Sequence, residues 1–439
     1  MAIDFTQRFL VLGVGITGAS VVHFLRKQNA WLRVADSRVG HESVEKLALQ
    51  YPDLELVVGE FGEQLLDHVD VLVINPGLSQ QLPIVQAALE RGIEVIGDIE
   101  LFARVVDCPV VAVTGTNGKS TVVSMLQAMG DCSDRKILCG GNIGEPALSL
   151  LEQGADAIVL ELSSYQLEST RHLRPMVACV LNVSEDHMDR YSGMSAYAAA
   201  KQNIYFGASR GVWLLEDALS KPLREDIESV AVSCEVPATG VYGVRDHWLS
   251  FGEQPLFDLR QLASSGAHNE LNACFAWAMA ETLELGTEAM AKGLQQFKGL
   301  AHRTELVAEI EGVKYFNDSK GTNVGATLVA LRSMSSKVVL LAGGDGKSQD
   351  FSPLRSALQQ CARALVTYGA DGGQIAAIAP ELTPVFSADS LESAVNIAKT
   401  QALPGDCILL SPACASFDMF KSYQDRGRAF VACVEGLRA

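Results

Sequence analysis

The chain is poor in basic residues. Its 439 residues include 35 Lys and Arg against 52 Asp and Glu, which gives a formal net charge of −17. A general nucleic-acid binder needs a basic surface, so this balance excludes that class of protein. The acidic field also repels anionic ligands. Any phosphate site must therefore be built locally from backbone N–H groups, helix N-termini, a few cations and metal ions.

Long apolar runs and regular cysteine spacings are also missing. No run reaches the roughly 18 apolar residues that cross a bilayer. The first residues carry Asp4 and Arg8 and lack the plan of a signal peptide. The ten cysteines are scattered and form no CxxC pair, which is typical of reduced thiols rather than of disulfides or a zinc site. We therefore expect a cytoplasmic protein without membrane insertion.

What the chain does contain is a repeated alternation of apolar runs and helix-like stretches. This alternation predicts an α/β fold with parallel sheets, and the length predicts about three domains. The pattern restarts near Asp98 and after Gly299, so we expect domains over 1–97, 98–299 and 300–439. The expected strands are 8–12, 31–35, 54–58, 71–74 and 93–96, then 110–113, 157–162, 177–183 and 212–215, then 314–316, 338–341, 364–366 and 408–410.

The strongest motif is Thr114-Gly115-Thr116-Asn117-Gly118-Lys119-Ser120-Thr121, which follows a predicted strand and opens a predicted helix. Backbone N–H groups and a helix N-terminus would face phosphates there. Lys119 adds a local positive charge, and a hydroxyl after it can reach Mg²⁺. Val113 stands where the common phosphate-binding loop has its first Gly. A tight turn without a ligand is the alternative, but Gly-Lys-Ser-Thr in this setting favours a nucleotide.

A second glycine motif, Gly13–Gly18, follows the strand 8–12, and Asp36 closes the next strand. Glycines allow a close backbone approach to a diphosphate, and an acid about 20 residues on can bind a ribose. This motif alone is compatible with NAD, with another nucleotide diphosphate or with no ligand. Because the Lys119 loop supplies a separate nucleotide site, we expect a nucleotide-tagged substrate here.

Two further segments follow strands of the second block. Glu161 ends an apolar strand, where a carboxylate can hold Mg²⁺ directly or through water. The segment Asn182–Arg190 follows the strand 177–183, so we expect His187 at the same sheet edge, beside Glu161. A solvent-facing carboxylate and a surface histidine are the alternatives. In the third block the loops 317–320, 341–347 and 410–417 follow strands, where open α/β sheets bind ligands. Each is also compatible with plain turn chemistry, but three such loops in one domain favour a ligand site.

Together these residues resemble the Mur ligase family, ATP-dependent amide-forming enzymes of cell-wall precursor synthesis, over essentially the whole chain. The shortened phosphate loop is typical of that family. The Asp-Asn-Pro-Arg motif of its diaminopimelate- or lysine-adding members is absent, which favours the D-glutamate-adding branch. Further matching segments are Gly13–Ser20, Gly97–Phe102, Gly140–Gly144, Glu185–Tyr191, Gly343–Lys347 with Asp350-Phe351, and Ser411–Phe417.

The resemblance implies a Rossmann-like N-terminal domain for the UDP substrate, a central P-loop-type mononucleotide-binding domain and a C-terminal Rossmann-like α/β domain. It implies roles for single residues in the central site. ATP would be bound by Gly115, Thr116, Asn117, Gly118, Lys119, Ser120, Thr121 and Asn272, with His302, Arg303 and Asp318 from the third domain. Two Mg²⁺ ions would be held by Ser120, Glu161, His187 and Lys201, and catalysis would depend on Lys119, His187, Asn142 and Lys201.

The resemblance further implies that Lys201 is carbamylated and acts as an anionic ligand, whereas the residues alone place it on a helix surface. The UDP part of the substrate would be held by Gly15, Ile16, Thr17, Asp36, Ser37, Arg38, Asn75 and Gly77. D-Glutamate would be surrounded by Lys320, Thr322, Lys347, Ser416, Phe417 and Tyr423. A dicarboxylate needs cations and hydroxyls, and Lys347 with Ser416 can supply both.

The implied reaction uses ATP to activate the carboxylate of UDP-N-acetylmuramoyl-L-alanine as an acyl phosphate, which then accepts the amine of D-glutamate. We expect a monomer whose third domain swings on residues 299–301. The alternatives are an L-alanine-adding or folylpolyglutamate-type ligase of the same superfamily, an NAD-dependent dehydrogenase built on Gly13–Gly18, and a nucleotide-binding scaffold without activity. The dehydrogenase reading leaves Lys119 and the third domain unexplained.

Overall fold

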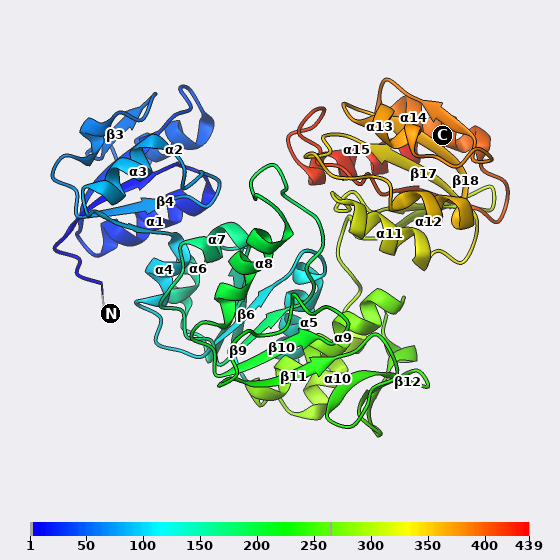
Figure 1. Ribbon diagram of the computed structural model, residues 1–439, viewed down its shortest axis with the longest axis horizontal. Helices are drawn as coiled ribbons and strands as arrows, with labels where there is room; N and C mark the ends of the chain where they lie inside the picture. The colour runs from blue at the N-terminus through cyan, green and yellow to red at the C-terminus, as the bar shows by residue number, and fades with distance from the viewer. Residues whose placement is uncertain (1–2, 264–265, 439) are drawn as a thin grey trace. The chain divides into compact units, whose positions relative to one another are not determined.

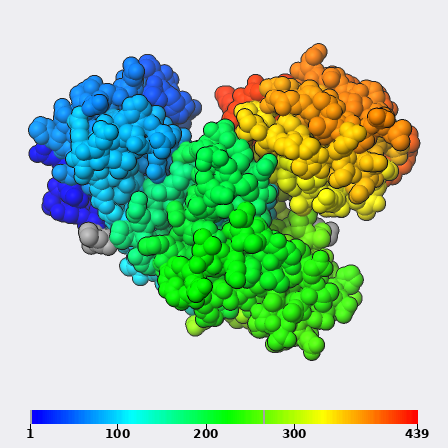
Figure 2. Space-filling model, in the orientation of Figure 1, coloured from blue at the N-terminus to red at the C-terminus, as the bar shows by residue number. Residues whose placement is uncertain are grey.

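A computed structural model describes residues 3–263 and 266–438. This part of the chain contains three β-sheets, of five, nine and six strands, each packed with helices. The chain groups into two compact units. The first unit contains the five- and nine-stranded sheets. The second contains the six-stranded sheet and two segments from earlier in the chain, Val183–Ala196 and Leu262–Glu270. Figure 2 shows the molecular surface coloured along the chain, from blue at the N-terminus through green to red at the C-terminus. The expected three-domain α/β architecture is therefore confirmed.

The five-stranded sheet is wholly parallel, in the order β3-β2-β1-β4-β5. Its central strands are buried on both faces, which is why they read as continuous apolar runs rather than as alternating ones. The strands are β1 (Arg8–Leu12), β2 (Trp31–Asp36), β3 (Glu55–Val58), β4 (Val71–Ile74) and β5 (Glu94–Ile96). The helices are α1 (Ile16–Lys27), α2 (Glu42–Gln50), η1 (Glu63–Leu66), α3 (Pro83–Glu90) and α4 (Asp98–Ala103).

The nine-stranded sheet has the order β14-β13-β12-β11-β10-β9-β6-β8-β7, parallel except for the meander β12-β13-β14. Its strands are β6 (Val110–Thr114), β7 (Ile137–Gly141), β8 (Ala157–Glu161), β9 (Val177–Val180), β10 (Arg210–Leu214), β11 (Glu228–Val232), β12 (Val241–Arg245), β13 (Trp248–Phe251) and β14 (Gln254–Asp258). The helices of this region are α5 (Lys119–Asp131), α6 (Ala147–Leu150), η2 (Leu151–Gln153), α7 (Ser164–Glu168), α8 (Met194–Gln202), η3 (Asn203–Tyr205), η4 (Leu259–Gln261), α9 (Ala267–Ala280), η5 (Glu281–Leu283) and α10 (Thr287–Gln296).

The six-stranded sheet has the order β15-β16-β20-β17-β18-β19, and only the β15–β16 pair is antiparallel. Helices cover both faces (Figure 1): Val339 and Leu341 pack in the core beneath α14 and α15, whereas Leu340 packs beneath α11 and α12. The strands are β15 (Glu305–Ile310), β16 (Val313–Asn317), β17 (Val338–Gly343), β18 (Ala362–Tyr368), β19 (Val385–Ser387) and β20 (Cys407–Leu410). The helices are α11 (Val324–Ser333), α12 (Leu354–Cys361), α13 (Gly372–Ala377), α14 (Leu391–Gln401) and α15 (Tyr423–Gly436).

All the strands expected from apolar runs are present, with ends that differ by a few residues. The strand expected over 177–183 is too long. β9 ends at Val180, and beyond it Asn182 bonds to the loop after β6: Thr116 N donates to Asn182 O at 2.9 Å. Seven strands were not among those expected, namely β7, β11, β12, β13, β14, β15 and β19. β7, β14, β15 and β19 lie at the ends of their sheets, where one side is unpaired and the apolar pattern is weaker. In the described parts of the chain, no helix combines the length and apolarity needed to span a membrane.

Candidate active site

The loop between β6 and α5 is shaped by two glycines. Gly115 has φ +152° and Gly118 has φ +89°, conformations that side-chain-bearing residues rarely adopt. A Cβ on Gly118 would lie 2.8 Å from Asn272 Oδ1, and one on Gly115 would lie 3.0 Å from Leu181 Cβ. Space and backbone conformation therefore both require glycine here. The loop opens onto the N-terminus of the 13-residue helix α5, whose first turn contains the buried Ser120 and Thr121.

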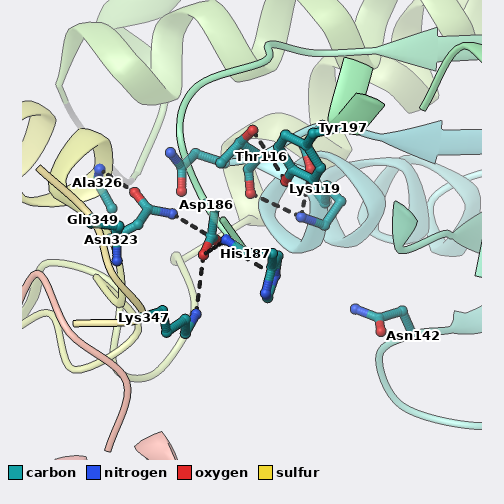
Figure 3. Close-up of polar contacts among 12 residues, drawn as sticks. Thr116, Lys119, Asn142, Asp186, His187, Tyr197, Asn323, Ala326, Lys347 and Gln349 are labelled. Atoms are coloured by element: carbon teal, nitrogen blue, oxygen red, sulfur yellow. Dashed lines mark hydrogen bonds and ion pairs between the residues drawn. The ribbon is translucent and has the colours of Figure 1, made fainter. Parts of the chain in front are cut away.

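Asn182 holds this loop from the end of β9. Its backbone oxygen accepts from Thr116 N at 2.9 Å, its Oδ1 accepts from Asn117 N at 2.9 Å, and its Nδ2 donates to Asn117 O at 3.0 Å. Lys119 folds back over the loop and donates to Gly115 O at 2.7 Å and to Thr116 O at 2.9 Å (Figure 3). The ammonium group is thus fixed over the loop where phosphates would bind.

Glu161 lies at the end of β8, in register with Val113 of β6. Its side chain is only 2% exposed. Asn142, just after β7, donates from Nδ2 to Glu161 Oε1 at 2.8 Å and from its backbone N to Glu161 O at 2.8 Å. A carboxylate is thus placed one strand away from the Lys119 loop, as the sequence pattern indicated, with the amide of Asn142 beside it.

Lys201 is buried, with 1% exposure, so its expected place on a helix surface is wrong. Helix α8 points it at the phosphate loop. Its Nζ donates to Gly115 O at 2.9 Å and lies 4.4 Å from the centre of the Tyr197 ring. The Tyr197 hydroxyl in turn lies 3.4 Å from Thr116 Oγ1. Helical spacing alone did not reveal this burial, because Ala198, Ala199 and Ala200 give α8 no clear polar face.

The N-terminal sheet carries a cavity of about 260 Å³ at the carboxyl ends of β1, β2 and β4, lined by Gly13, Gly15, Asp36, Ser37, Arg38, Phe61, Asn75, Gly77 and Leu78. Six of the eight residues expected to hold UDP line it. Ile16 and Thr17 instead begin α1, outside this lining. Phe61 and Leu78 form an apolar part of the wall that the sequence pattern did not indicate. Both residues follow a strand by a few positions, and this placement near the carboxyl end of a strand was the signal that could have identified them.

Both carboxylate oxygens of Asp36 accept hydrogen bonds from neighbouring residues of the site. Oδ2 accepts from Val14 N at 2.6 Å and from Arg38 Nη2 at 2.7 Å, and Oδ1 accepts from Arg38 Nε at 2.9 Å. Burial opposes the ionised form, but the bonds from Arg38 and Val14 outweigh it and lower the pKa of Asp36 to about 2. The carboxylate therefore fixes the glycine loop and aims the half-exposed Arg38, whereas its expected contact with a ribose stays a prediction.

In the second unit, Asp318 follows β16 and is buried. Its Oδ2 accepts from Ser411 Oγ at 2.7 Å and its Oδ1 from Thr304 N at 3.1 Å. Burial raises the pKa of Asp318 to about 6, and these bonds together with Arg303 oppose the rise. His302 lies close by, with Nδ1 2.8 Å from Asn317 Nδ2, and burial lowers the pKa of His302. His302, Arg303 and Asp318 are thus brought together, as expected for one site.

Five of the residues expected around D-glutamate lie on loops after β16, β17 and β20, and the sixth, Tyr423, begins α15. Lys320 Nζ lies 4.1 Å from the centre of the Tyr423 ring, Ser416 is buried, and Phe417 is 73% exposed. Thr322 continues the Lys320 turn, donating its N–H to Lys320 O at 2.8 Å. The buried Arg426 of α15 ties two of these loops together by donating to Ser319 O, Ala415 O and Cys414 O at 2.9, 3.2 and 3.1 Å.

Lys347 pairs with Asp186, a residue that the sequence pattern did not single out. The distance from Lys347 Nζ to Asp186 Oδ1 is 3.0 Å, and Asn323 Nδ2 donates to Asp186 Oδ2 at 3.1 Å. Burial raises the pKa of Asp186, but Lys347, His187 and Asn323 outweigh this effect and lower it overall. Asp186 and His187 belong to the segment of the second unit that follows β9. The expected place of His187 beside Glu161 therefore stays a prediction.

No cluster of three or more His, Cys, Asp or Glu suited to a metal ion occurs in residues 3–263 and 266–438. This is compatible with Mg²⁺, which keeps several waters and is commonly bound by one or two carboxylates plus substrate phosphates. All ten cysteines are free thiols, as expected.

Three family models match the chain in succession. Residues 7–97 match the Mur ligase MurD-like N-terminal domain, residues 113–280 the Mur ligase middle domain, and residues 302–414 the Mur ligase glutamate ligase domain. These matches cover most of the chain and follow the three sheets in order.

Close relatives span nearly the full length. The UDP-N-acetylmuramoylalanine–D-glutamate ligase of Marinobacter nauticus is 44% identical over 98% of both chains, and that of Pseudomonas syringae is 42% identical over 100% of both. Two solved structures from Thermotoga maritima share the fold. These are the UDP-N-acetylmuramate-alanine ligase (TM-score 0.61, 17% identity, 98% of this chain and 100% of the other) and the MurF ligase in complex with ADP (TM-score 0.62, 16% identity, 99% of both).

Proposed function

The chain belongs to the Mur ligase family and is an ATP-dependent ligase that adds D-glutamate to UDP-N-acetylmuramoyl-L-alanine in peptidoglycan synthesis, and we propose that it does so through an acyl phosphate formed at the Lys119 loop. The assignment of the substrates rests on the sequence identity to D-glutamate ligases over nearly the full length of the chain. The chemistry is supported by the loop itself, which combines a cation, backbone N–H groups and a helix N-terminus in an acidic protein.

Each of the three parts of the chain binds a different ligand. Residues 1–97 hold the UDP part in the cavity beside Arg38 and Asp36, residues 98–299 hold ATP, and residues 300–439 bring in D-glutamate. Support comes from the 260 Å³ cavity, from the glycine loop and from Lys320, whose Nζ lies 4.1 Å from the centre of the Tyr423 ring.

The residues at the Lys119 loop suit Mg²⁺-ATP. Ser120 and Glu161 supply the hydroxyl and carboxylate oxygens that Mg²⁺ prefers, and the glycines leave room that a Cβ at Gly115 or Gly118 would fill. Bound there, Mg²⁺ would offset the charge of the phosphates. We place a second Mg²⁺ with His187 and Lys201, and Asn272 against the adenine, with His302, Arg303 and Asp318 closing on the nucleotide.

Carbamylation of Lys201 is part of this proposal, and a contact in the structure supports it. Lys119 and Lys201 donate to the same oxygen, Gly115 O, at 2.7 and 2.9 Å, so their ammonium groups lie within about 6 Å of each other. Two positive charges at that distance repel by about 3 kcal/mol at an effective dielectric constant of 20. A carbamate on Lys201 replaces this repulsion with attraction and supplies an anionic oxygen for Mg²⁺.

The reaction has two steps. A carboxylate oxygen of UDP-N-acetylmuramoyl-L-alanine attacks the γ-phosphorus of ATP and ADP leaves, while Lys119 stabilises the charge on the transferring group. The amine nitrogen of D-glutamate then attacks the acyl carbon, phosphate leaves with the C–O bond electrons, and the nitrogen loses its proton. The products are an amide, ADP, phosphate and a proton. Asn142, beside Glu161, is placed to orient the reacting carboxylate.

D-Glutamate is held by charge and by hydroxyl groups. Lys320 and Lys347 supply cations, Ser416 and Thr322 supply hydroxyls, and Phe417 and Tyr423 supply aromatic surface. We further propose that the enzyme is a cytoplasmic monomer. The ten free thiols suit the reducing cytoplasm. Sedimentation equilibrium checks the monomer.

The test is ADP release from ATP with UDP-N-acetylmuramoyl-L-alanine and a panel of amino acids. D-Glutamate should support turnover, whereas L-alanine, L-glutamate and D-aspartate should not. Lys119→Ala should reduce kcat by at least about 100-fold, because it removes a cation from the transferring phosphate. Turnover with L-alanine or L-glutamate but not D-glutamate would overturn the proposal in favour of another ligase of the superfamily.

A further inference from the structure

One buried carboxylate, that of Asp186, is bound by donors from three parts of the second unit. Oδ1 lies 3.0 Å from Lys347 Nζ and accepts the N–H of His187 at 2.9 Å. Oδ2 accepts from Asn323 Nδ2 at 3.1 Å. Figure 3 shows Asp186 with Lys347 and Asn323 converging on it from different loops. Nothing in the proposed reaction uses this contact.

Both partners of Asp186 are held by their own backbones. Asn323 caps α11 by accepting from Ala326 N at 2.8 Å. Lys347 lies in a tight turn after β17, with φ +50°, and donates its N–H to Asp345 Oδ1 at 3.0 Å. Gln349 of the same turn accepts from Val324 N at 3.1 Å, which joins the turn to the start of α11. The Lys347 turn and the Asn323 cap therefore form one prearranged receptor for a carboxylate.

The ligand of this receptor is a side chain of the protein itself. The side chains of Lys347 and Asp186 are 14% and 9% exposed, so the pair is largely shielded from water. Lys347 is also the cation that the proposed function assigns to a carboxylate of D-glutamate. A carboxylate attached to the chain thus occupies the group that a substrate carboxylate needs.

We propose that Asp186 determines the affinity for D-glutamate by occupying its carboxylate position on Lys347, and that the amino acid binds by displacing Asp186. This inference rests on the proposed function. A tethered group acts at an effective concentration that can reach the millimolar range, so it competes measurably with a free ligand. The apparent dissociation constant rises in proportion as the fraction of molecules with Lys347 available falls.

The exchange also explains how the largely shielded Lys347 keeps a counter-charge in both states. One carboxylate leaves as another arrives, so the ammonium group never lies without a partner in a site with little water, which would be costly. Only a ligand that brings its own carboxylate can complete the exchange. Removing the charge of Asp186 should therefore strengthen binding of D-glutamate, the opposite of what loss of a supporting residue does.

The test compares the full-length protein with Asp186→Asn and Asn323→Ser. Asn keeps an oxygen for the N–H of His187 but lacks the charge, and a charge-assisted bond is roughly twice as strong as a neutral one. Ser still caps α11 but loses the donor that holds Asp186. D-Glutamate is titrated by calorimetry in the presence of UDP-N-acetylmuramoyl-L-alanine and a non-hydrolysable ATP analogue. Both variants should bind it about three- to tenfold more tightly, with the affinity for the ATP analogue changed less than about twofold.

Unchanged or weaker binding of D-glutamate by Asp186→Asn would overturn the inference. If that variant does not fold, as judged by its circular dichroism melt, Asn323→Ser decides by the same criterion. Titration with glutarate, a dicarboxylate without an amine, tests the exchange independently of catalysis and should show the same gain. Wild-type turnover separates the two proposals. Absence of turnover with D-glutamate contradicts the proposed function, whereas normal turnover with no gain in binding contradicts only the exchange.

Discussion

Lys119 and Lys201 donate to the same backbone oxygen, that of Gly115, although 82 residues separate them in the chain. One lysine comes from the first turn of α5 and the other from α8. Their meeting point is a glycine whose backbone conformation few other residues adopt. The phosphate loop is therefore held by two cations, and the chemical state of the second decides the charge of the site.

The activity of the enzyme should depend on carbon dioxide, because carbon dioxide is needed to carbamylate Lys201. Arginine cannot form the carbamate, so Lys201→Arg should lose at least about 100-fold in kcat while keeping its melting temperature, because it removes an anionic metal ligand and restores the like-charge pair. Wild-type ADP release should fall when bicarbonate is stripped from the buffer and recover when it is added. An active Lys201→Arg enzyme, or rates independent of bicarbonate, would contradict carbamylation.

Gly118 should tolerate no side chain. Gly118→Ala combines an unfavourable φ with a contact 2.8 Å from Asn272 Oδ1, so ATP affinity should fall at least about tenfold. Gly286→Ala is the matched control, since Gly286 has φ +79° but open space around its Cβ position. That control should cost about 1 kcal/mol of stability and leave turnover unchanged. Equal effects of the two substitutions on ATP binding would argue against a phosphate site at this loop.

Asn182 should act as the clamp of the phosphate loop. Asn182→Ala removes both side-chain bonds to Asn117, and we expect the KM for ATP to rise about tenfold because the loop must then be ordered by the nucleotide. Asn203→Ala removes a comparable bond to Leu167 O away from the loop. The control should destabilise the fold by about 1 kcal/mol without changing the KM for ATP. Initial rates over a range of ATP concentrations decide between the two outcomes.

Asp318 should make stability depend on pH. Its pKa is raised to about 6, so the folded state binds the proton more tightly than the unfolded chain, whose Asp titrates near 3.9. Its contribution to the free energy of unfolding is fully present below about pH 4 and is lost as the pH rises through about 6. Asp318→Asn should therefore raise stability at pH 7 by about 2 kcal/mol, flatten this pH dependence and weaken ATP binding.

Asp98 is the matched control for Asp318. Burial raises its pKa to about 6 as well, but it belongs to α4 of the first unit, where its Oδ2 accepts from Gln166 Nε2 at 3.0 Å. Asp98→Asn should stabilise the protein over the same pH window and leave the KM for ATP unchanged. Melting temperatures at pH 4 and pH 7, with ATP kinetics at pH 7, test both variants. If Asp318→Asn bound ATP normally, its place in the nucleotide site would be wrong.

The strands and the glycine loops were predictable from sequence because both depend on local rules. Buried parallel strands read as apolar runs, and the turn at Gly118 needs a residue that tolerates φ +89°. Glu161 was likewise recognisable, because a carboxylate at the end of an apolar strand is conspicuous. The resemblance to a known family added roles for residues such as Asn142 and Asn272 that no pattern of spacing would have indicated.

Contacts between distant segments were not predictable in this way. Lys201 looks like a surface lysine in a short alanine-rich helix, and only the packing of α8 shows that it is buried. Asp186 lies beside His187 in a loop, where an aspartate is ordinary turn chemistry. Its partner Lys347 is 161 residues further along the chain. Such pairs depend on tertiary packing, which composition and periodicity do not encode residue by residue.

The two compact units are not consecutive stretches of chain, and this limits how the enzyme can be divided. The chain passes from one unit to the other after Asn182, Ala196, Gln261, Glu270 and Gln296. A recombinant fragment that began at Phe297 would contain Lys347 and Asn323 but would lack Asp186. It would expose the receptor for a carboxylate without its internal occupant. Evolution or engineering that exchanges the amino-acid-binding part must therefore transfer short inserts from the middle of the gene together with its end.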